Sequence, residues 1–254
     1  NQLHFVSTDA SSQIFLEDAF IPLQPYLSNK NQYYYLWDLR SGLPDFIESG
    51  NLKIQPHFFT EIPSGIDYSF HNEDFILEVN KKSLFDTLYL QFTKEYDSLQ
   101  EKLIYTFNDR TVPLRKDVTI SLHDTDPQKN RYQVFKVDKK NRLDYVGSEQ
   151  NTAGCFTFKT RELGTFTLDN DTIKPVIKPI SWDRMGPKFM IKDLKSGIKS
   201  YHATLDDHFL LMEYDVKKNI LSARPKNEEK PIKGLFVLEV EDNFGNKTKI
   251  NKPL

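Results

Sequence analysis

The chain has 254 residues, and its 34 Lys and Arg residues nearly balance its 36 Asp and Glu residues. This balance gives no net positive field that would attract nucleic acid. No apolar run approaches the roughly 18 residues that a membrane-spanning helix needs, so we expect no transmembrane segment. The length exceeds the usual domain size of about 100 to 150 residues, which predicts at least two domains.

The chain starts at Asn1 rather than at methionine, and it contains one cysteine, Cys155. We therefore expect a processed protein or a fragment, with any signal peptide or lipid anchor outside it. A lone cysteine excludes an internal disulfide framework and a multi-cysteine zinc site. Because Cys155 lies in a strand-like stretch, we interpret it as a small core residue without chemistry.

Residues 1–60 carry an aromatic block, Tyr33-Tyr34-Tyr35-Leu36-Trp37. Five consecutive large side chains place aromatic rings on both faces of a strand, so one face enters a core and the other packs against a neighbouring element, a ligand or another chain. Packing within the chain is the favoured reading for any single residue. Interfaces are enriched in Tyr, Trp and Arg. The expected interface residues are Tyr33, Tyr34, Tyr35, Trp37 and Arg40.

Short runs that alternate apolar and polar residues recur up to residue 170 and predict antiparallel strands. The clearest of these runs lie at 75–79, 88–92, 118–122, 134–137, 156–158 and 166–168. The stretch 97–103 is the exception to this strand pattern, and we expect a short helix there. We expect residues 1–170 to form a β-rich sandwich region, with the strands of residues 1–60 packed on it.

Polar turn residues at 169–172 and prolines at 175 and 179 predict a linker. After it, residues 173–254 hold short strands joined by turn sequences, the pattern of an immunoglobulin-like sandwich. The expected strands lie at 188–192, 198–205, 208–214, 220–223, 235–241 and 247–251. The fold class predicted for the chain is therefore all-β, with tandem antiparallel β-sandwich domains of which the last is immunoglobulin-like.

The sequence offers little that indicates catalysis or metal binding. The nearest histidine pair, His202 and His208, flanks a turn but lacks the spacing of a zinc motif. Asp169 and Asp171 suggest calcium, but a solvated linker explains them better because the spacing of a calcium loop is missing. No nucleophile elbow, phosphate loop or dinucleotide fingerprint occurs. We expect no catalytic residue, metal ligand or cofactor, and no stoichiometric zinc in the purified chain.

Several segments, in order along most of the chain, resemble the region that follows the catalytic domain of large lysostaphin-type (LytM-like) zinc endopeptidases of Gram-negative envelopes. These segments are YYLWDLRSGLPD at 34–45, FFTEIPSG at 58–65, TIKPVIKPI at 172–180, KSGIKSY at 195–201, LMEYD at 211–215 and DNFGN at 242–246. Such endopeptidases cut peptidoglycan cross-links with zinc held by H-x-x-x-D and H-x-H motifs. The H-x-H motif does not occur here, so the resemblance implies the accessory region without its peptidase.

The resemblance implies a non-catalytic accessory or scaffold region in the periplasm or at the outer membrane. Its expected partners are an upstream peptidase-like domain or an envelope protein complex, and peptidoglycan is a further candidate. Two alternatives stay open. A glycan-binding or adhesive module would need an exposed aromatic platform near Trp37 or Trp182, and an enzyme would need converging carboxylates in a sandwich cleft.

Overall fold

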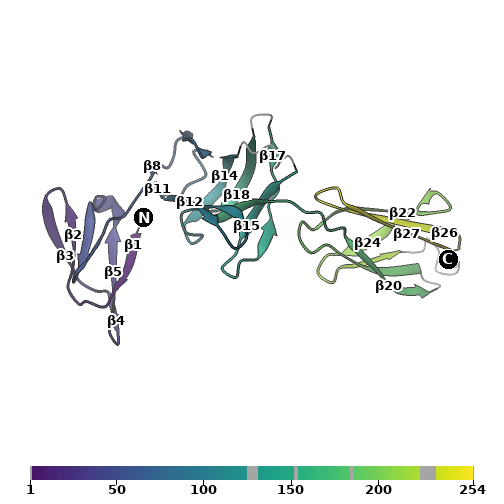
Figure 1. The fold of residues 1–254 in the computed structure, drawn as a ribbon, viewed down its shortest axis with the longest axis horizontal. Helices are drawn as coiled ribbons and strands as arrows, with labels where there is room; N and C mark the ends of the chain where they lie inside the picture. The colour runs from purple at the N-terminus through teal and green to yellow at the C-terminus, as the bar shows by residue number, and fades with distance from the viewer. Residues whose placement is uncertain (1, 125–130, 152–153, 184–185, 224–232, 254) are drawn as a thin grey trace. The chain divides into compact units, whose positions relative to one another are not determined.

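A computed structural model of the chain describes residues 2–124, 131–151, 154–183, 186–223 and 233–253. Within these ranges the chain forms antiparallel β-sheets and one short 3-10 helix, η1 (Leu39–Ser41), which is the all-β architecture of β-sandwich domains expected from the sequence (Figure 1). The chain divides into two compact units. Unit 1 comprises residues 1–95, 105–120 and 159–164, and unit 2 comprises residues 96–104, 121–158 and 165–254. No helix among the described residues is long and apolar enough to cross a membrane.

Two small sheets form the first part of unit 1. One has the order β1-β5-β4, built from β1 (Gln2–Ser7), β5 (Gln32–Asp38) and β4 (Leu27–Asn29). The other has the order β3-β2-β6-β7, built from β3 (Ala19–Leu23), β2 (Ser12–Leu16), β6 (Phe46–Ser49) and β7 (Leu52–Ile54). Strands β2 and β3 are joined by Glu17 and Asp18, which both have positive φ, as a tight two-residue hairpin requires.

The core of this region lies around the buried side chains of Ile14, Ile47 and Tyr35, whose exposed fractions do not exceed 1%. Its buried polar groups are paired. Ser12 and Ser49 share a 2.6 Å hydrogen bond between their hydroxyl groups, which removes the cost of burying either one alone.

Three sheets follow in the middle of the chain. The first has the order β17-β18-β14-β10-β9, built from β17 (Glu149–Gln150), β18 (Cys155–Glu162), β14 (Pro113–His123), β10 (Phe75–Val79) and β9 (Tyr68–His71). The second has the order β12-β13-β19-β15-β16, built from β12 (Phe92–Asp97), β13 (Lys102–Phe107), β19 (Gly164–Asp169), β15 (Gln133–Val137) and β16 (Leu143–Tyr145). Strands β11 (Leu88–Leu90) and β8 (Thr60–Ile62) pair separately. Phe75 and Phe107 are fully buried with ring centroids 4.8 Å apart, so they mark part of the core of unit 1.

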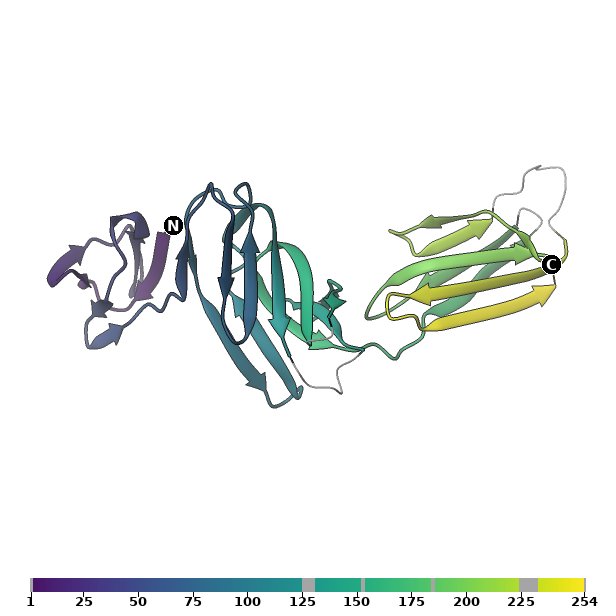
Figure 2. The same ribbon diagram turned by 90° about the horizontal axis from the view of Figure 1, so that it is seen from above.

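The last part of unit 2 is a sandwich of two four-stranded sheets, which lie as two layers in Figure 1. One sheet has the order β20-β21-β25-β24, built from β20 (Val176–Asp183), β21 (Gly186–Lys192), β25 (Ile220–Ala223) and β24 (Met212–Asp215). The other has the order β23-β22-β26-β27, built from β23 (His208–Phe209), β22 (Ile198–Leu205), β26 (Leu235–Asp242) and β27 (Lys247–Pro253). The adjacent strands β26 and β27 run antiparallel, as the yellow arrows in Figure 2 show.

A single hydrophobic core fills this sandwich. Phe189 and Phe236 stack with their centroids 5.4 Å apart, and Trp182 packs edge-on against both rings. Strand β26 alternates buried and half-exposed residues along its length, as its sequence pattern predicts. The expected strand 208–214 is interrupted, because residues 210 and 211 separate β23 from β24.

The prediction of a helix at 97–103 is wrong. These residues end β12, form a turn and begin β13. The carboxylate of Asp97 accepts hydrogen bonds from the backbone N–H groups of Leu99 and Gln100, and Glu101 has a φ of 53°. Such a side-chain cap with a left-handed residue closes a hairpin and cannot continue a helix.

Candidate interaction surface and polar clusters

The aromatic block lies on β5, the central strand of its three-stranded sheet. Tyr35 is fully buried, stacks on Phe5 with a centroid distance of 5.0 Å, and donates its hydroxyl to the carbonyl of Asp9 at 3.0 Å. Because β-strand side chains alternate, Tyr34 points to the face opposite Tyr35. Tyr35 therefore belongs to the core of the region.

The other expected interface residues stay partly exposed. Trp37 donates its indole N–H to the carbonyl of Gly42 at 2.8 Å, and the hydroxyl of Tyr34 donates to Gln32 at 3.1 Å. Tyr33 is half-buried and lies opposite Ser7 and Ser28 in the flanking strands. These positions leave side-chain surface on β5 for contacts outside the sheet.

Arg40 is exposed, and its guanidinium binds the carboxylate of Asp38, with Nε 2.9 Å from Oδ1. The hydrogen bond from the Arg40 side chain is the main reason that the pKa of Asp38 falls to about 2. The backbone N–H of Arg40 donates to the same carboxylate at 3.0 Å, so Asp38 caps the start of helix η1. Arg40 is thus held at the end of the aromatic strand.

A second aromatic feature, which was not predicted from the sequence, is what we call the phenylalanine patch: Phe15, Phe20 and Phe46. The strand register places Phe15 opposite both Phe20 and Phe46, on the sheet face away from the buried Ile14 and Ile47. The Phe15 and Phe46 rings stack at 4.7 Å, and Phe20 is 50% exposed.

The edge of the patch carries a positive charge. The ammonium group of Lys53 lies 3.3 Å from the centre of the Phe46 ring. A local signal was present in the sequence, since Phe15 and Phe20 flank a two-residue Glu-Asp turn. The contribution of Phe46 depends on strand pairing and could not be inferred locally.

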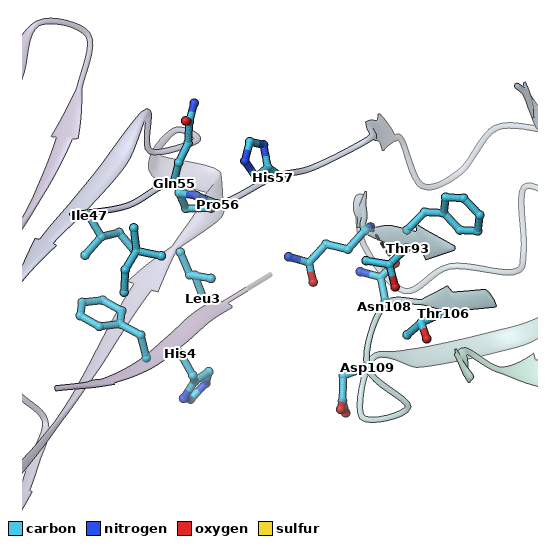
Figure 3. Close-up of a pocket in the computed structure, with 14 residues that line it drawn as sticks. Leu3, His4, Ile47, Gln55, Pro56, His57, Thr93, Thr106, Asn108 and Asp109 are labelled. Carbon is cyan, nitrogen blue, oxygen red and sulfur yellow. Dashed lines mark hydrogen bonds between the residues drawn. The ribbon is translucent and has the colours of Figure 1, made fainter. Parts of the chain in front are cut away.

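A cavity of about 590 Å³ lies in unit 1 (Figure 3). It is lined by residues 3–5, 47, 54–57, 91–93, 106 and 108–109. Two of its polar side chains form hydrogen bonds with the backbone. Asn108 donates to the carbonyl of Tyr89 and accepts the N–H of Gln91, and Asp109 accepts the N–H of Thr111. We assign this cavity no chemistry.

A smaller hollow of about 430 Å³ lies over β9, β10 and β14, and its lining includes the carboxylates of Asp67, Glu78 and Asp117. Ser69 also lines it and shares a 2.7 Å hydrogen bond with Nε2 of His71 on the same exposed strand. Asp67 accepts the backbone N–H of Lys81. This hollow is the feature most relevant to the enzyme alternative.

The histidine pair His202 and His208 has separate contacts. The His202 ring packs against Phe209 at 5.8 Å, and Nδ1 of His208 lies 2.7 Å from the carbonyl oxygen of Asp206 in its own turn. Trp182, the residue considered as a glycan platform, packs against the core described above. The ammonium group of Lys252 lies 4.3 Å from the centre of the Trp182 ring.

The interpretation of Asp169 and Asp171 as a solvated linker is wrong, because the two residues are only 5% and 2% exposed. Asp169 forms ion pairs with Lys102 and Lys195. Asp171 accepts the backbone N–H groups of Ile173 and Ser196, at 2.9 and 3.1 Å.

Asp171, Asp193 and Asp242 form what we call the aspartate group, in which one carboxylate oxygen of each residue lies within 4.8 Å of the others. Oδ2 of Asp193 accepts three backbone N–H groups, those of residues 195, 196 and 197, at 2.8 to 3.0 Å. Oδ1 of Asp242 accepts the N–H groups of Phe244 and Asn246. Among the residues that the structure describes, neither His202 nor His208 joins a group of this kind.

The described residues form tandem β-sandwich domains. The phenylalanine patch lies on a sheet of unit 1, and the aspartate group lies in unit 2. In comparison with known families, residues 63–171 match the model of the Zu5-like domain. No curated protein matches the chain. The relation to lysostaphin-type endopeptidases is therefore carried by the sequence resemblance alone.

Proposed function

We propose that this chain is a non-catalytic accessory or scaffold region of a cell-envelope peptidase-like protein, and that it docks onto a protein partner in the periplasm or at the outer membrane. The observation that carries the docking role is the phenylalanine patch. Three phenylalanines gather on the outer face of a sheet, and Phe20 leaves half of its surface in water. Clusters of exposed apolar residues are typical of protein interaction sites.

Residues 1–54 also expose apolar side chains outside the phenylalanine patch. Tyr26, Leu27, Leu52 and Ile54 are each 44 to 64% exposed on or beside the short strands β4 and β7. The β5 segment from Tyr33 to Arg40, proposed from the sequence as an interface, belongs to the same region. The envelope assignment is supported by the resemblance described above.

Site-specific photocrosslinking tests the docking role. A photoreactive phenylalanine analogue replaces Phe20 in the protein expressed in the cells that produce it, and the crosslinked products are identified by mass spectrometry. The matched control places the same analogue at Phe209, which is 68% exposed on the last sandwich. We expect one envelope protein, or an upstream domain of the same polypeptide, to be crosslinked from position 20 and not from position 209. Equal products from both positions, or a cytosolic partner, would contradict the proposal.

A digestion assay separates this function from the enzyme alternative. The purified chain is incubated with peptidoglycan and with a panel of soluble glycans, and released fragments are quantified. We expect no release above buffer. Release that disappears in the Ser69→Ala or Glu78→Gln variant would assign activity to the hollow over β9 and β10 and would replace the accessory role.

A further inference from the structure

The two small sheets of residues 1–54 share a core, but some apolar side chains on their inner faces stay exposed. Residues paired across neighbouring strands point to the same sheet face. The register pairs Ile54 with the buried Ile47, and Leu52 with the buried Ser49. Ile54 and Leu52 therefore face inward, although they are 44% and 64% exposed. The edge strand β7 thus leaves part of the inner face uncovered.

Strand β1, an edge strand of the other small sheet, shows the same feature. Phe5 pairs with the buried Tyr35 and stacks on its ring, and Leu3 lies two positions away on the same face. Both Phe5 and Leu3 are only half-buried. Leu3, Phe5, Ile47 and Ile54 all line the cavity of about 590 Å³ (Figure 3). The cavity is therefore the place where the inner faces open between β1 and β7.

Strand β1 also offers backbone groups for pairing. It ends the sheet order β1-β5-β4, and all six of its residues pair with β5, so the other side of its backbone is a free edge. His4 points to the face opposite Leu3 and Phe5, yet all three residues line the cavity. A cavity that contacts both faces of a strand extends along the edge of that strand.

The sequence of β1 lacks the features that protect other edges from pairing. Natural sheets discourage an added strand with charged residues or prolines at their edges. The other described edge strands of five or more residues carry such residues: Pro22 in β3, Lys94 in β12, Pro179 in β20 and Lys249 in β27. Strand β1, with the sequence QLHFVS, contains no Lys, Arg, Asp, Glu or Pro. Its edge is therefore open to the addition of a strand.

We propose that the free edge of β1 binds an extended segment of a partner protein as an additional strand, and that the apolar side chains of this segment enter the cavity. Because strand side chains alternate, every second residue of the segment would meet Leu3, Phe5 and Ile54. The cavity volume lies within the usual range of binding sites, about 300 to 1,000 Å³. Its lining contains the carboxylate of Asp109 and no Lys or Arg, so charge complementarity favours a neutral or basic segment.

A second copy of this chain fits the site less well. Two six-residue edges would form a small contact beside the roughly 1,200 Å² that stable interfaces bury at least. Residues 55–57 and 91–93 also border the cavity, and a folded sandwich is far larger than this space. The inference goes beyond the docking role of the phenylalanine patch and does not depend on it, because the patch lies on the outer face of its sheet.

Selection from a phage-displayed library of random peptides on the immobilised full chain tests the proposal. We expect the enriched peptides to carry apolar residues at alternate positions and few acidic residues. One enriched peptide is then synthesised, and its affinity is measured by fluorescence polarisation. The Ile54→Lys variant should bind this peptide about tenfold or more weakly, because a lysine in the cavity opposes the burial of apolar side chains.

The matched control is Val176→Lys, which places a lysine at a 39% exposed apolar residue on β20, an edge strand of the last sandwich. This variant should bind the peptide like the original chain. The absence of enriched peptides, or equal affinity of the Ile54→Lys variant, would overturn the proposal. A dimer in solution that Ile54→Lys converts to a monomer would overturn it as well, because a second copy would then occupy the site.

A backbone test on the original chain separates strand pairing from simple apolar binding, even if the Ile54→Lys variant does not fold. The peptide is synthesised with N-methyl groups on alternate amides, in each of the two possible phases. Successive N–H groups of a strand point to opposite sides, so the phase that blocks the side facing β1 should abolish binding. Unchanged binding of both methylated peptides would show that the segment does not pair with β1.

Discussion

Asp171 and Asp193 accept hydrogen bonds from the same backbone group, the N–H of Ser196, at 3.1 and 2.8 Å. One carboxylate belongs to the segment before the last sandwich, and the other belongs to the turn that contains Ser196. The shared donor therefore fixes the segment that precedes β20 against the loop between β21 and β22. This contact makes Asp171 a structural part of the domain that it precedes.

The Asp171→Ala variant should be less stable than the original chain. The substitution removes the acceptor of the Ile173 N–H and one of the two acceptors of the Ser196 N–H, and a typical hydrogen bond contributes about 0.5 to 1.5 kcal/mol. The measurement is urea unfolding in EDTA, followed by Trp182 fluorescence in a Trp37→Phe background. Asp215→Ala is the control, because its cap lies in an exposed turn and its loss should cost less. Equal stability of the two variants would show that Asp171 does not anchor the sandwich.

Tyr35 and Tyr34 should respond differently to truncation, although they are neighbours. Tyr35→Ala removes a fully buried ring and should destabilise residues 1–54 by about 3 to 5 kcal/mol. Tyr34→Ala removes a half-exposed ring and should cost less than about 1 kcal/mol. Trp37 fluorescence in a Trp182→Phe background reports unfolding of this region. A large loss of stability in Tyr34→Ala would place Tyr34 in the core and remove it from the proposed interface.

The sequence predicted strands well where burial follows a local alternating pattern, as in β10 and β26. It could not predict contacts that depend on pairing between distant segments. Asp171 and Ser196 lie 25 positions apart, and their contact arises only once β20 to β22 have folded. The same holds for Phe46, which joins the phenylalanine patch through its register with Phe15. The error at 97–103 has a local cause, since a capped turn and a helix begin with similar polar residues.

Two aspartates with similarly low pKa values should respond differently when their arginine is removed. The pKa values of Asp38 and Asp138 both fall from 3.8 to about 2. The side chain of Arg40 is the main cause for Asp38, whereas the backbone N–H of Arg142 is the main cause for Asp138. Arg40→Ala should therefore raise the pKa of Asp38 more than Arg142→Ala raises that of Asp138. Both pKa values can be measured from carboxyl carbon chemical shifts, followed by NMR from about pH 1.5 to about pH 6. This pH range includes the usual aspartate pKa.

The sign of the stability effect follows from these lowered pKa values. A carboxylate whose pKa is lower in the folded chain stabilises that chain above the unfolded value, here 3.8. The contribution is lost as the pH falls from 3.8 towards about 2. Arg40→Ala should make unfolding of residues 1–54 less dependent on pH in this window. An equal rise of both pKa values in the two variants would contradict the assigned causes.

The last sandwich should fold without the rest of the chain, but its stability should depend on where the fragment begins. Its core is made of its own residues, including Phe189, Phe236 and Leu238, and a domain with its own core can fold alone. A fragment of residues 173–254 lacks Asp171, whereas a fragment of residues 170–254 retains it. Both should unfold cooperatively in a thermal or urea experiment followed by Trp182 fluorescence.

The longer fragment should be more stable by about 1 to 3 kcal/mol in EDTA, because Asp171 accepts three hydrogen bonds that typically contribute about 0.5 to 1.5 kcal/mol each. Its carboxylate accepts two backbone N–H groups, and its carbonyl accepts the side-chain amide of Asn246 at 2.9 Å. Introducing Asp171→Ala into the longer fragment should remove most of the difference and leave the part due to the carbonyl. If residues 173–254 unfold without cooperativity while 170–254 melt as a unit, the domain begins at Asp171. If neither fragment melts cooperatively, the sandwich needs its neighbour, and the boundary expected from the sequence is wrong.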